Sequence, residues 1–273
     1  MHLMQPKSMQ LFSTKLQHHT RHSMGKHFYQ KLSEPRSVMS GYVSKHRHNA
    51  CLQAKHNRVV VYATLIGYGT ACSKKLLKQM AYNIAWHWNY PKAKIVIAGK
   101  TYRLCFEVKY QYLPNLQKQW VYNNKSLQNV FVRVESEIEF GVSVMDAVGA
   151  NSGFFLVSNV GYKGASTEAH EYGHALGLWP GSATAHPEDL DQRGQGVPGL
   201  MYPRGTLVDP QYQYDPKVPA GERGGTVHPD TRRVRQVDID VLMSTVNLDH
   251  NSRFWNFGKL SNKYHGQKYG TSE

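Results

Sequence analysis

Cysteine is scarce in this sequence, and the cysteines present are not grouped. The 273 residues include three of them, Cys51, Cys72 and Cys105, with no Cys-x-x-Cys pair. This spacing favours neither a framework of disulfide bonds nor a zinc site built from thiolates. Any metal site in the chain is therefore expected to use histidine or carboxylate ligands.

Long apolar runs are also missing. No stretch approaches the roughly 18 consecutive apolar residues of a membrane-spanning helix. The first residues, MHLMQPKSMQLFSTKLQ, lack the apolar centre of a signal peptide. We therefore expect no membrane span and see no secretion signal. Apolar residues still make up 40% of the chain, which is enough for a globular core.

Acidic residues are few, above all near the N-terminus. The chain carries 33 Lys and Arg against 19 Asp and Glu, a formal net charge of +14, and residues 1–58 alone hold ten basic residues and one acidic residue. We predict that residues 1–57 form a basic, disordered leader and that residues 251–273 form a loose basic tail. Adhesion of the leader to nucleic acid or anionic lipid is the alternative interpretation.

Hydrophobic patterns place the ordered domain at residues 58–250. Strands are predicted at VVVYATLIGYG, TYRLCFEVKYQYL, NVFVRVESEIEF and Gly153–Val160, and a helix is predicted from Ala71 to Trp88. A second helix is expected to begin at Ser166 or Thr167 and to end at Gly177. Residues 178–229 lack periodicity and predict a long irregular segment.

A closing helix is predicted at Asp230–Ser244, with one apolar face made of Val234, Val237, Val241 and Leu242. The order of elements is strand, helix, several strands, helix, irregular segment and helix. The predicted fold class is therefore α+β, a mixed twisted sheet with helices and a lower half built from loops.

The second predicted helix contains the segment HEYGHALGL, His170–Leu178. Residues four apart on a helix lie one above the other, so His170 and His174 can point two imidazole nitrogens at one zinc ion. Glu171 is rotated away from the ion and can reach a water molecule beside it, from which its carboxylate can take a proton. The spacing of these three residues is therefore what a zinc site with a catalytic water requires. The competing interpretation is that the two histidines are ordinary surface or core residues, which is the more frequent case for histidines on a helix.

The context of this segment carries a family resemblance. HEYGHALGL followed by GLMYPRG, Gly199–Gly205, resembles the metzincin superfamily of zinc endopeptidases, and its Met-Tyr-Pro form is most similar to the matrixin branch. The resemblance covers residues 58–250 in architecture and 166–205 in motif. It implies a mixed twisted sheet with two helices, the second carrying the zinc motif, and an irregular lower subdomain with a Met-turn and a C-terminal helix.

The third zinc ligand departs from the family pattern. The position three residues after Gly177 is Pro180, which cannot bind a metal. An insertion after Leu178 or Trp179 would bring His186 to the place of the third ligand, and His186 is the residue we choose. Asp189, Asp191 and His228 remain alternatives, because carboxylates bind zinc as histidines do. A site without a third protein ligand is a further alternative.

By the same resemblance, Met201 lies beneath the metal as a hydrophobic base, and Gly153–Val160 is the edge strand along which an extended substrate binds. Tyr202, with Tyr212 or Tyr214, would line the substrate cleft or stabilise the reaction intermediate. Trp179 would form one side of the cleft. For each of these side chains, plain packing in the core is the competing interpretation.

The leading hypothesis is a monomeric zinc endopeptidase that acts on protein or peptide substrates. The run RGQGVPGLMYPRGTLVDPQYQYDP is similar to metallopeptidase domains of bacterial Rhs-type polymorphic toxins, which implies a secreted or delivered effector. A zinc-binding pseudo-peptidase that docks a partner without turnover is the second hypothesis, because the third-ligand spacing is disrupted. A basic nucleic-acid binder ranks last, because the charge is concentrated outside the predicted domain.

Overall fold

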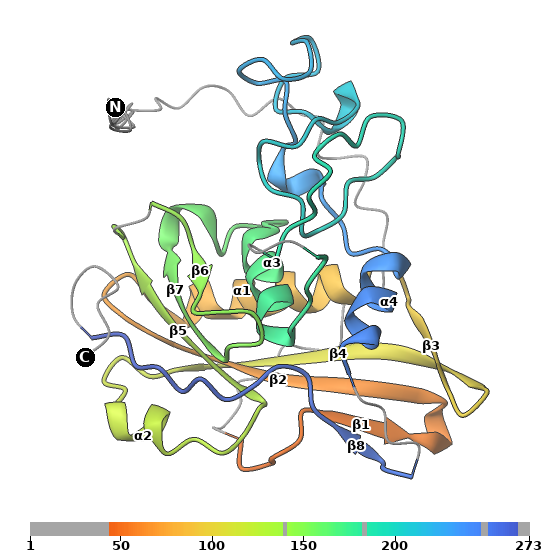
Figure 1. Ribbon diagram of the computed structural model, residues 1–273. Coiled ribbons are helices and arrows are strands. Elements are labelled where there is room, and N and C mark those ends of the chain that lie inside the picture. Colours follow the sequence, from red (N-terminus) through yellow and green to blue (C-terminus); the bar gives the residue numbers. More distant parts are fainter. Residues whose placement is uncertain (1–43, 139–140, 182–184, 247–250, 267–273) are drawn as a thin grey trace, which may run out of the picture. The chain divides into compact units, whose positions relative to one another are not determined.

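The computed structural model describes residues 44–138, 141–181, 185–246 and 251–266. Within these ranges the chain forms an α+β fold, in which a mixed β-sheet carries four α-helices (Figure 1). In the same ranges, no helix is long and apolar enough to cross a membrane.

The main sheet has the strand order β3-β4-β2-β5-β7-β6, and the short strands β1 and β8 extend it beside β2. The strands are β1 (Ala50–Gln53), β2 (Arg58–Tyr68), β3 (Lys94–Ile97), β4 (Lys100–Tyr112), β5 (Asn129–Glu135), β6 (Val144–Met145), β7 (Ser152–Leu156) and β8 (Phe254–Trp255). Strand β2 runs parallel to β4 and β5, and β5 runs parallel to β7. The outer strands β3 and β6 are antiparallel to their neighbours.

The burial of each strand follows its sequence pattern. Strand β2 lies between parallel neighbours and is buried along nearly its whole length, which explains why its sequence is a continuous apolar run rather than an alternating one. Strand β4 alternates instead, because only one of its faces is covered.

The helices are α1 (Lys74–Asn89), α2 (Lys118–Tyr122), α3 (Thr167–Leu176) and α4 (Gln236–Ser244). Short 3-10 turns occur at Ala54–His56, Val157–Asn159, Pro210–Tyr212 and Pro229–Thr231. Helix α1 begins where the side chain of Ser73 accepts a hydrogen bond from the amide of Leu76. Helices α1 and α3 lie on the same side of the sheet (Figure 1).

Trp88 fixes α1 against α3 and so helps to position the helix that carries the histidine motif. Its indole is fully buried, it contacts the rings of Phe106 and Tyr172, and its Nε1 donates to the carbonyl of Ala169 at 3.0 Å. Because the indole N–H is satisfied inside the core, the large ring is buried without leaving an unpaired donor.

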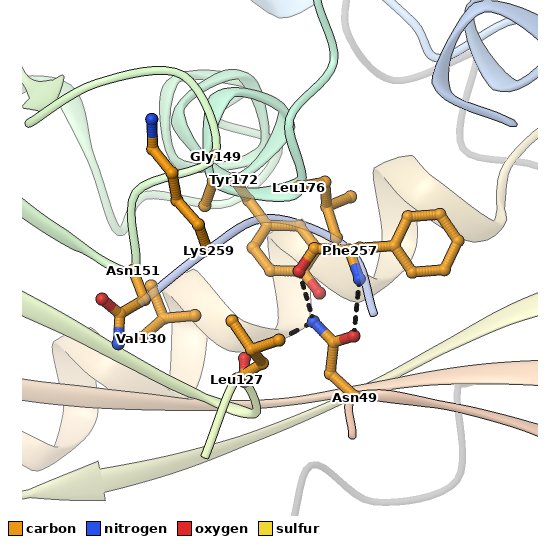
Figure 2. A pocket seen from close by; sticks show the side chains of 10 residues that line it. Asn49, Leu127, Val130, Gly149, Asn151, Tyr172, Leu176, Phe257 and Lys259 are labelled. Atoms are coloured by element: carbon orange, nitrogen blue, oxygen red, sulfur yellow. Dashed lines mark hydrogen bonds between the residues drawn. The ribbon is translucent and has the colours of Figure 1, made fainter. Parts of the chain in front are cut away.

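Strand pairing in the described residues reaches outside the range 58–250 that the sequence predicted for the domain. Strand β1 lies within the range assigned to the leader, and it pairs with β2 and with β8, which lies within the range assigned to the tail. Asn49 joins the same two segments, since its amide group bonds both the carbonyl and the amide of Phe257, each at 2.8 Å (Figure 2). These contacts are made between segments more than 200 residues apart, so local patterns could not reveal them. Residues 1–43 of the predicted leader lie outside the described residues.

Two predictions about elements are wrong. Strand β7 is not an edge strand, because it lies between β5 and β6, and β6 is the strand at the end of the sheet. The closing helix begins at Gln236 rather than Asp230, and Val237, predicted on its apolar face, is 51% exposed. Residues 229–231 form a separate 3-10 turn, so the helical periodicity cannot be extended back through them.

Candidate metal centre

Three histidines meet beside α3. The helix carries His170 and His174 one turn apart, and the irregular segment after α3 brings His186 to them. One ring nitrogen from each lies within 4.8 Å of the others, and Nε2 of His170 is 3.0 Å from Nε2 of His186. Ligand nitrogens of a tetrahedral zinc site are about 3.3 Å apart, given Zn–N distances of about 2.0–2.1 Å. The cluster could therefore hold a metal ion.

The orientation of His170 is fixed from behind. Its Nδ1 donates to the carbonyl oxygen of Leu200, at a distance of 2.9 Å. Nε2 is then the unprotonated nitrogen, and its lone pair faces the other two rings. A carbonyl behind an imidazole is the usual support of a metal-binding histidine, because it selects the tautomer and holds the ring plane. Imidazole nitrogens suit several transition-metal ions, among them zinc, copper, iron and nickel.

The electrostatic environment keeps the three imidazoles neutral, as metal ligands must be. Burial, reinforced by the Arg232 guanidinium, lowers the pKa of His170 well below its ordinary value. Burial and the neighbouring His186 ring lower the pKa of His174 to about 4. Burial, and to a smaller extent the Arg232 guanidinium, lowers the pKa of His186. At neutral pH each ring therefore offers an unprotonated nitrogen.

Glu171 lies beside the cluster on the same helix and is 6% exposed. Its Oε2 accepts a hydrogen bond of 3.0 Å from the backbone amide of Met145 in the edge strand β6. Burial raises the pKa of Glu171 to about 8, against the opposing effects of the Met145 amide and Arg232. A carboxyl group with such a pKa can both take and return a proton near neutral pH.

The end of α3 sends the chain towards the third histidine. Gly177 adopts a positive φ of 88°, its amide bonds the carbonyl of His174, and the amide of Leu178 bonds the carbonyl of Gly173. This pair of bonds is the Schellman termination, which requires a residue that tolerates the left-handed conformation. Gly177 thus ends the helix as predicted.

A tight turn containing Met201 packs against α3 at Gly173. The amide of Tyr202 bonds the carbonyl of Gly199 across this turn, and Met201 is 2% exposed. A Cβ atom on Gly173 would lie 2.7 Å from Sδ of Met201 and 3.2 Å from Trp88. Glycine in the motif HEYGH therefore lets the turn approach α3, and the same turn supplies the Leu200 carbonyl that orients His170.

Arg232 connects the segments around the centre, and the sequence analysis did not identify it. Its buried guanidinium donates to Tyr202 O at 2.7 Å, to Ser166 Oγ at 2.9 Å and to Pro229 O at 3.2 Å. It thereby ties the Met201 turn to the start of α3 and to the 3-10 turn Pro229–Thr231. Ser166 does not cap α3 with its side chain, because its hydroxyl donates to the carbonyl of Pro229. A single arginine in a loop gave no signal in the sequence.

The alternative ligands lie elsewhere in the described part of the chain. Asp189 and Asp191 are exposed, and Asp191 pairs with Arg193. His228 accepts a hydrogen bond from the amide of Asp230, and its ring lies 4.7 Å from that of Tyr214. None of them belongs to the cluster of three histidines. Residues 182–184 of the predicted insertion loop lie outside the described residues.

The remaining predicted side chains have mixed positions. Tyr202 is buried in the turn, Tyr212 is half-buried, and Tyr214 and Trp179 are 46% and 52% exposed. Roles for these rings at a cleft stay predictions. The backbone amide of Met145 is a further contact of the centre that the sequence did not indicate. Compared with models of known protein families and with curated proteins, the chain matches none.

Proposed function

We propose that this chain is a zinc-dependent endopeptidase whose metal ligands are His170, His174 and His186 and whose general base is Glu171. The observation that carries the proposal is the convergence of three neutral imidazole nitrogens beside a buried carboxylate on the same helix. Three protein ligands leave a fourth position open for water or substrate, which is the arrangement of catalytic rather than structural zinc sites.

When bound, zinc supplies Lewis acidity, which polarises a substrate carbonyl and makes water acidic enough to lose a proton near neutral pH. The Glu171 carboxylate accepts that proton as the water attacks the carbonyl carbon. It then delivers the proton to the leaving amine nitrogen, so that one side chain serves as base and as acid. The hydrogen bond from the Met145 amide to Oε2 favours the carboxylate form of Glu171 that the first step needs, because it lowers the pKa of the group.

We place the substrate along β6, the strand at the end of the sheet, in place of β7. Support comes from the contact between Met145 of β6 and Glu171, which puts this edge beside the candidate base. A peptide added to a sheet edge binds through its own backbone, so such a site accepts many sequences. Assignment to the metzincins, and to a secreted or delivered bacterial toxin effector, rests on the sequence resemblance of residues 166–205.

The test combines zinc stoichiometry with cleavage of unfolded casein by the wild type, Glu171→Ala and His186→Ala. We expect one zinc per chain in the wild type, loss of cleavage with zinc retained in Glu171→Ala, and loss or weakening of zinc in His186→Ala. Zinc binding without cleavage in the wild type would favour a docking module instead. Absence of zinc binding would refute the proposal.

A further inference from the structure

The turn between β6 and β7 (residues 146–151, the β6–β7 turn) is attached to the motif helix at two points. The amide of Met145, at its start, donates to Glu171 Oε2 at 3.0 Å. The amide of Gly149 donates to the carbonyl of His174 at 2.6 Å. The position of this turn therefore bears on both the carboxylate and the backbone of one histidine in the metal centre.

The turn needs support from outside, because β6 is short. It has two residues, which pair with Phe154 and Gly153 of β7. A strand of this length contributes few backbone hydrogen bonds and is easily displaced. Other contacts must then hold the Met145 amide against Glu171.

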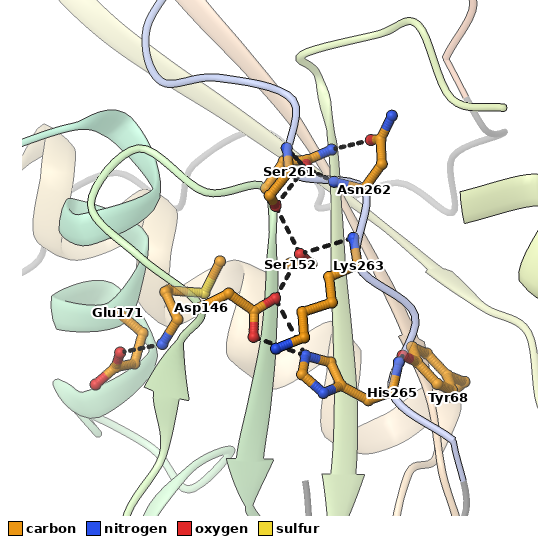
Figure 3. Close-up of polar contacts among 10 residues, drawn as sticks. Tyr68, Asp146, Ser152, Glu171, Ser261, Asn262, Lys263 and His265 are labelled. Carbon is orange, nitrogen blue, oxygen red and sulfur yellow. Dashed lines mark hydrogen bonds and ion pairs between the residues drawn. The ribbon is translucent and has the colours of Figure 1, made fainter. Parts of the chain in front are cut away.

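That support comes from the C-terminal segment, residues 255–266, which we call the strap (Figure 3). Nε2 of His265 lies 2.9 Å from Oδ1 of Asp146, and Oδ2 of Asp146 accepts a hydrogen bond of 2.6 Å from Ser152. Both partners of the Asp146–His265 pair are nearly buried, with side-chain exposures of 11% and 4%. An interaction between such groups is screened little by solvent and has a defined geometry.

His265 is itself held firmly in place. Its amide donates to the hydroxyl of Tyr68 at 3.0 Å, its carbonyl accepts from Arg133 at 3.1 Å, and its ring meets Phe154 edge to face. The anchor for the turn is thus connected to β2, β5 and β7 in the centre of the sheet. A rigid scaffold of this kind can set the position of a neighbouring group within a fraction of an ångström.

We propose that Asp146 and His265 are positioning residues, whose pair fixes the β6–β7 turn so that the Met145 amide holds the Glu171 carboxylate at the metal centre. The inference rests on the proposed function, in which Glu171 is the base. The strap stays attached when this pair is broken, because Lys259 bonds Gly149 and the amides of Ser261 and Asn262 bond Asn151. The same bonds hold the end of the turn, so loss of the pair acts on the start of the turn, at Asp146 next to Met145.

Two substitutions at His265 separate hydrogen bonding from packing. His265→Gln keeps an N–H donor for Asp146 and loses the ring, whereas His265→Phe keeps a ring against Phe154 and loses the donor. Leu260→Ala, at a strap residue that is 42% exposed, is the matched control. Each full-length protein is measured for zinc content, for kcat and KM on casein peptides, and for hydrogen exchange of the Met145 amide by NMR with selectively labelled methionine.

In His265→Phe we expect one zinc per chain, a kcat about tenfold or more below the wild type, a nearly unchanged KM, and faster exchange of the Met145 amide. His265→Gln and Leu260→Ala should stay close to the wild type in all four. Equal losses in the Gln and Phe variants, or a Met145 amide that exchanges normally in His265→Phe, would overturn the inference. The exchange measurement decides the matter even if the wild type cleaves nothing, an outcome that would refute only the proposed function.

Discussion

At the scale of single residues, the candidate centre depends on atoms that lie behind the ligands as much as on the ligands themselves. Leu200 orients His170 through its carbonyl, Met145 holds Glu171 through its amide, and Arg232 ties the supporting turn to α3. Two of these contacts are made by backbone atoms, which every residue type except proline provides in full. Side-chain identity therefore matters most where space is restricted, as at Gly173.

Gly173→Ala tests this restriction. The new Cβ would lie 2.7 Å from Sδ of the buried Met201, so Met201 must move, and we expect its turn to move with it and to draw the Leu200 carbonyl away from His170. We expect zinc affinity to fall about tenfold or more. Global stability should fall by no more than about 2 kcal/mol, because a helix gain of about 1 kcal/mol from glycine to alanine offsets part of an overpacking cost of about 1–3 kcal/mol.

Gly205→Ala is the control, since a Cβ at Gly205 meets nothing within 4 Å. Zinc affinity is measured by competition with a coloured chelator, and stability by urea unfolding. Equal affinities in the two alanine variants would show that the Met201 turn does not set the geometry of the centre.

At the scale of elements, α1 and α3 form a unit on one side of the sheet. Trp88 of α1 bonds Ala169 of α3, and His87, fully buried on α1, places Nε2 3.2 Å from the carbonyl of Ala165 just before α3. Burial, with a smaller effect from Arg233, lowers the pKa of His87 to about 3. The packing of these helices is therefore linked to pH.

The sign of this linkage follows from the depressed pKa. Below the ordinary pKa of 6.5 the unfolded chain binds a proton at His87 and the folded chain does not. The contribution of neutral His87 to the free energy of unfolding is therefore fully present above pH 6.5 and is lost as the pH falls towards about 3. The loss amounts to about 1.4 kcal/mol per pH unit. At pH 5 it reaches about 2 kcal/mol relative to pH 7.

His87→Gln keeps a donor for Ala165 and removes the titration. We expect its free energy of unfolding to fall less steeply between pH 7 and pH 5 than that of the wild type. Both proteins are measured with a chelator present, so that metal release from the three site histidines does not contribute. Parallel curves for the two proteins would mean that His87 is not the group responsible.

At the scale of the whole molecule, segments from different parts of the chain are brought together. Strand β8 pairs with β1 and closes the domain from both ends of the described chain, and His186 crosses from the irregular segment to α3. A metal ion at the centre would bind the native state and not the unfolded chain. Its binding energy would then add to the stability of the domain.

Zinc should raise the thermal midpoint and a chelator should lower it. With free zinc at 100 times its dissociation constant the gain is about 2.7 kcal/mol, which corresponds to roughly 5–10 °C for a domain of this size. The shift, measured by scanning calorimetry with and without a chelator, should be largely absent in His186→Ala. A shift of the same size in that variant would exclude His186 as a ligand.

The sequence by itself determined the elements whose information is local. Four features of this kind depend only on neighbouring residues in the chain. They are the alternation in β4, the continuous apolar run of β2, the glycine that ends α3, and the four-residue spacing of His170 and His174. These features predicted the α+β class and the helix that carries the motif. His186 was chosen from the insertion hypothesis, and the structure places its ring beside the other two.

Only the tertiary structure decided which strand lies at the edge, which segments outside residues 58–250 pair with the sheet, and what supports the centre. β6 has two residues and no periodicity to detect, and β1 becomes a strand through pairing with β2 and β8. Arg232, Asp146 and His265 act through partners tens to more than a hundred residues away. Hydrogen bonds of that span follow from how the chain is folded in space, and no local pattern encodes them.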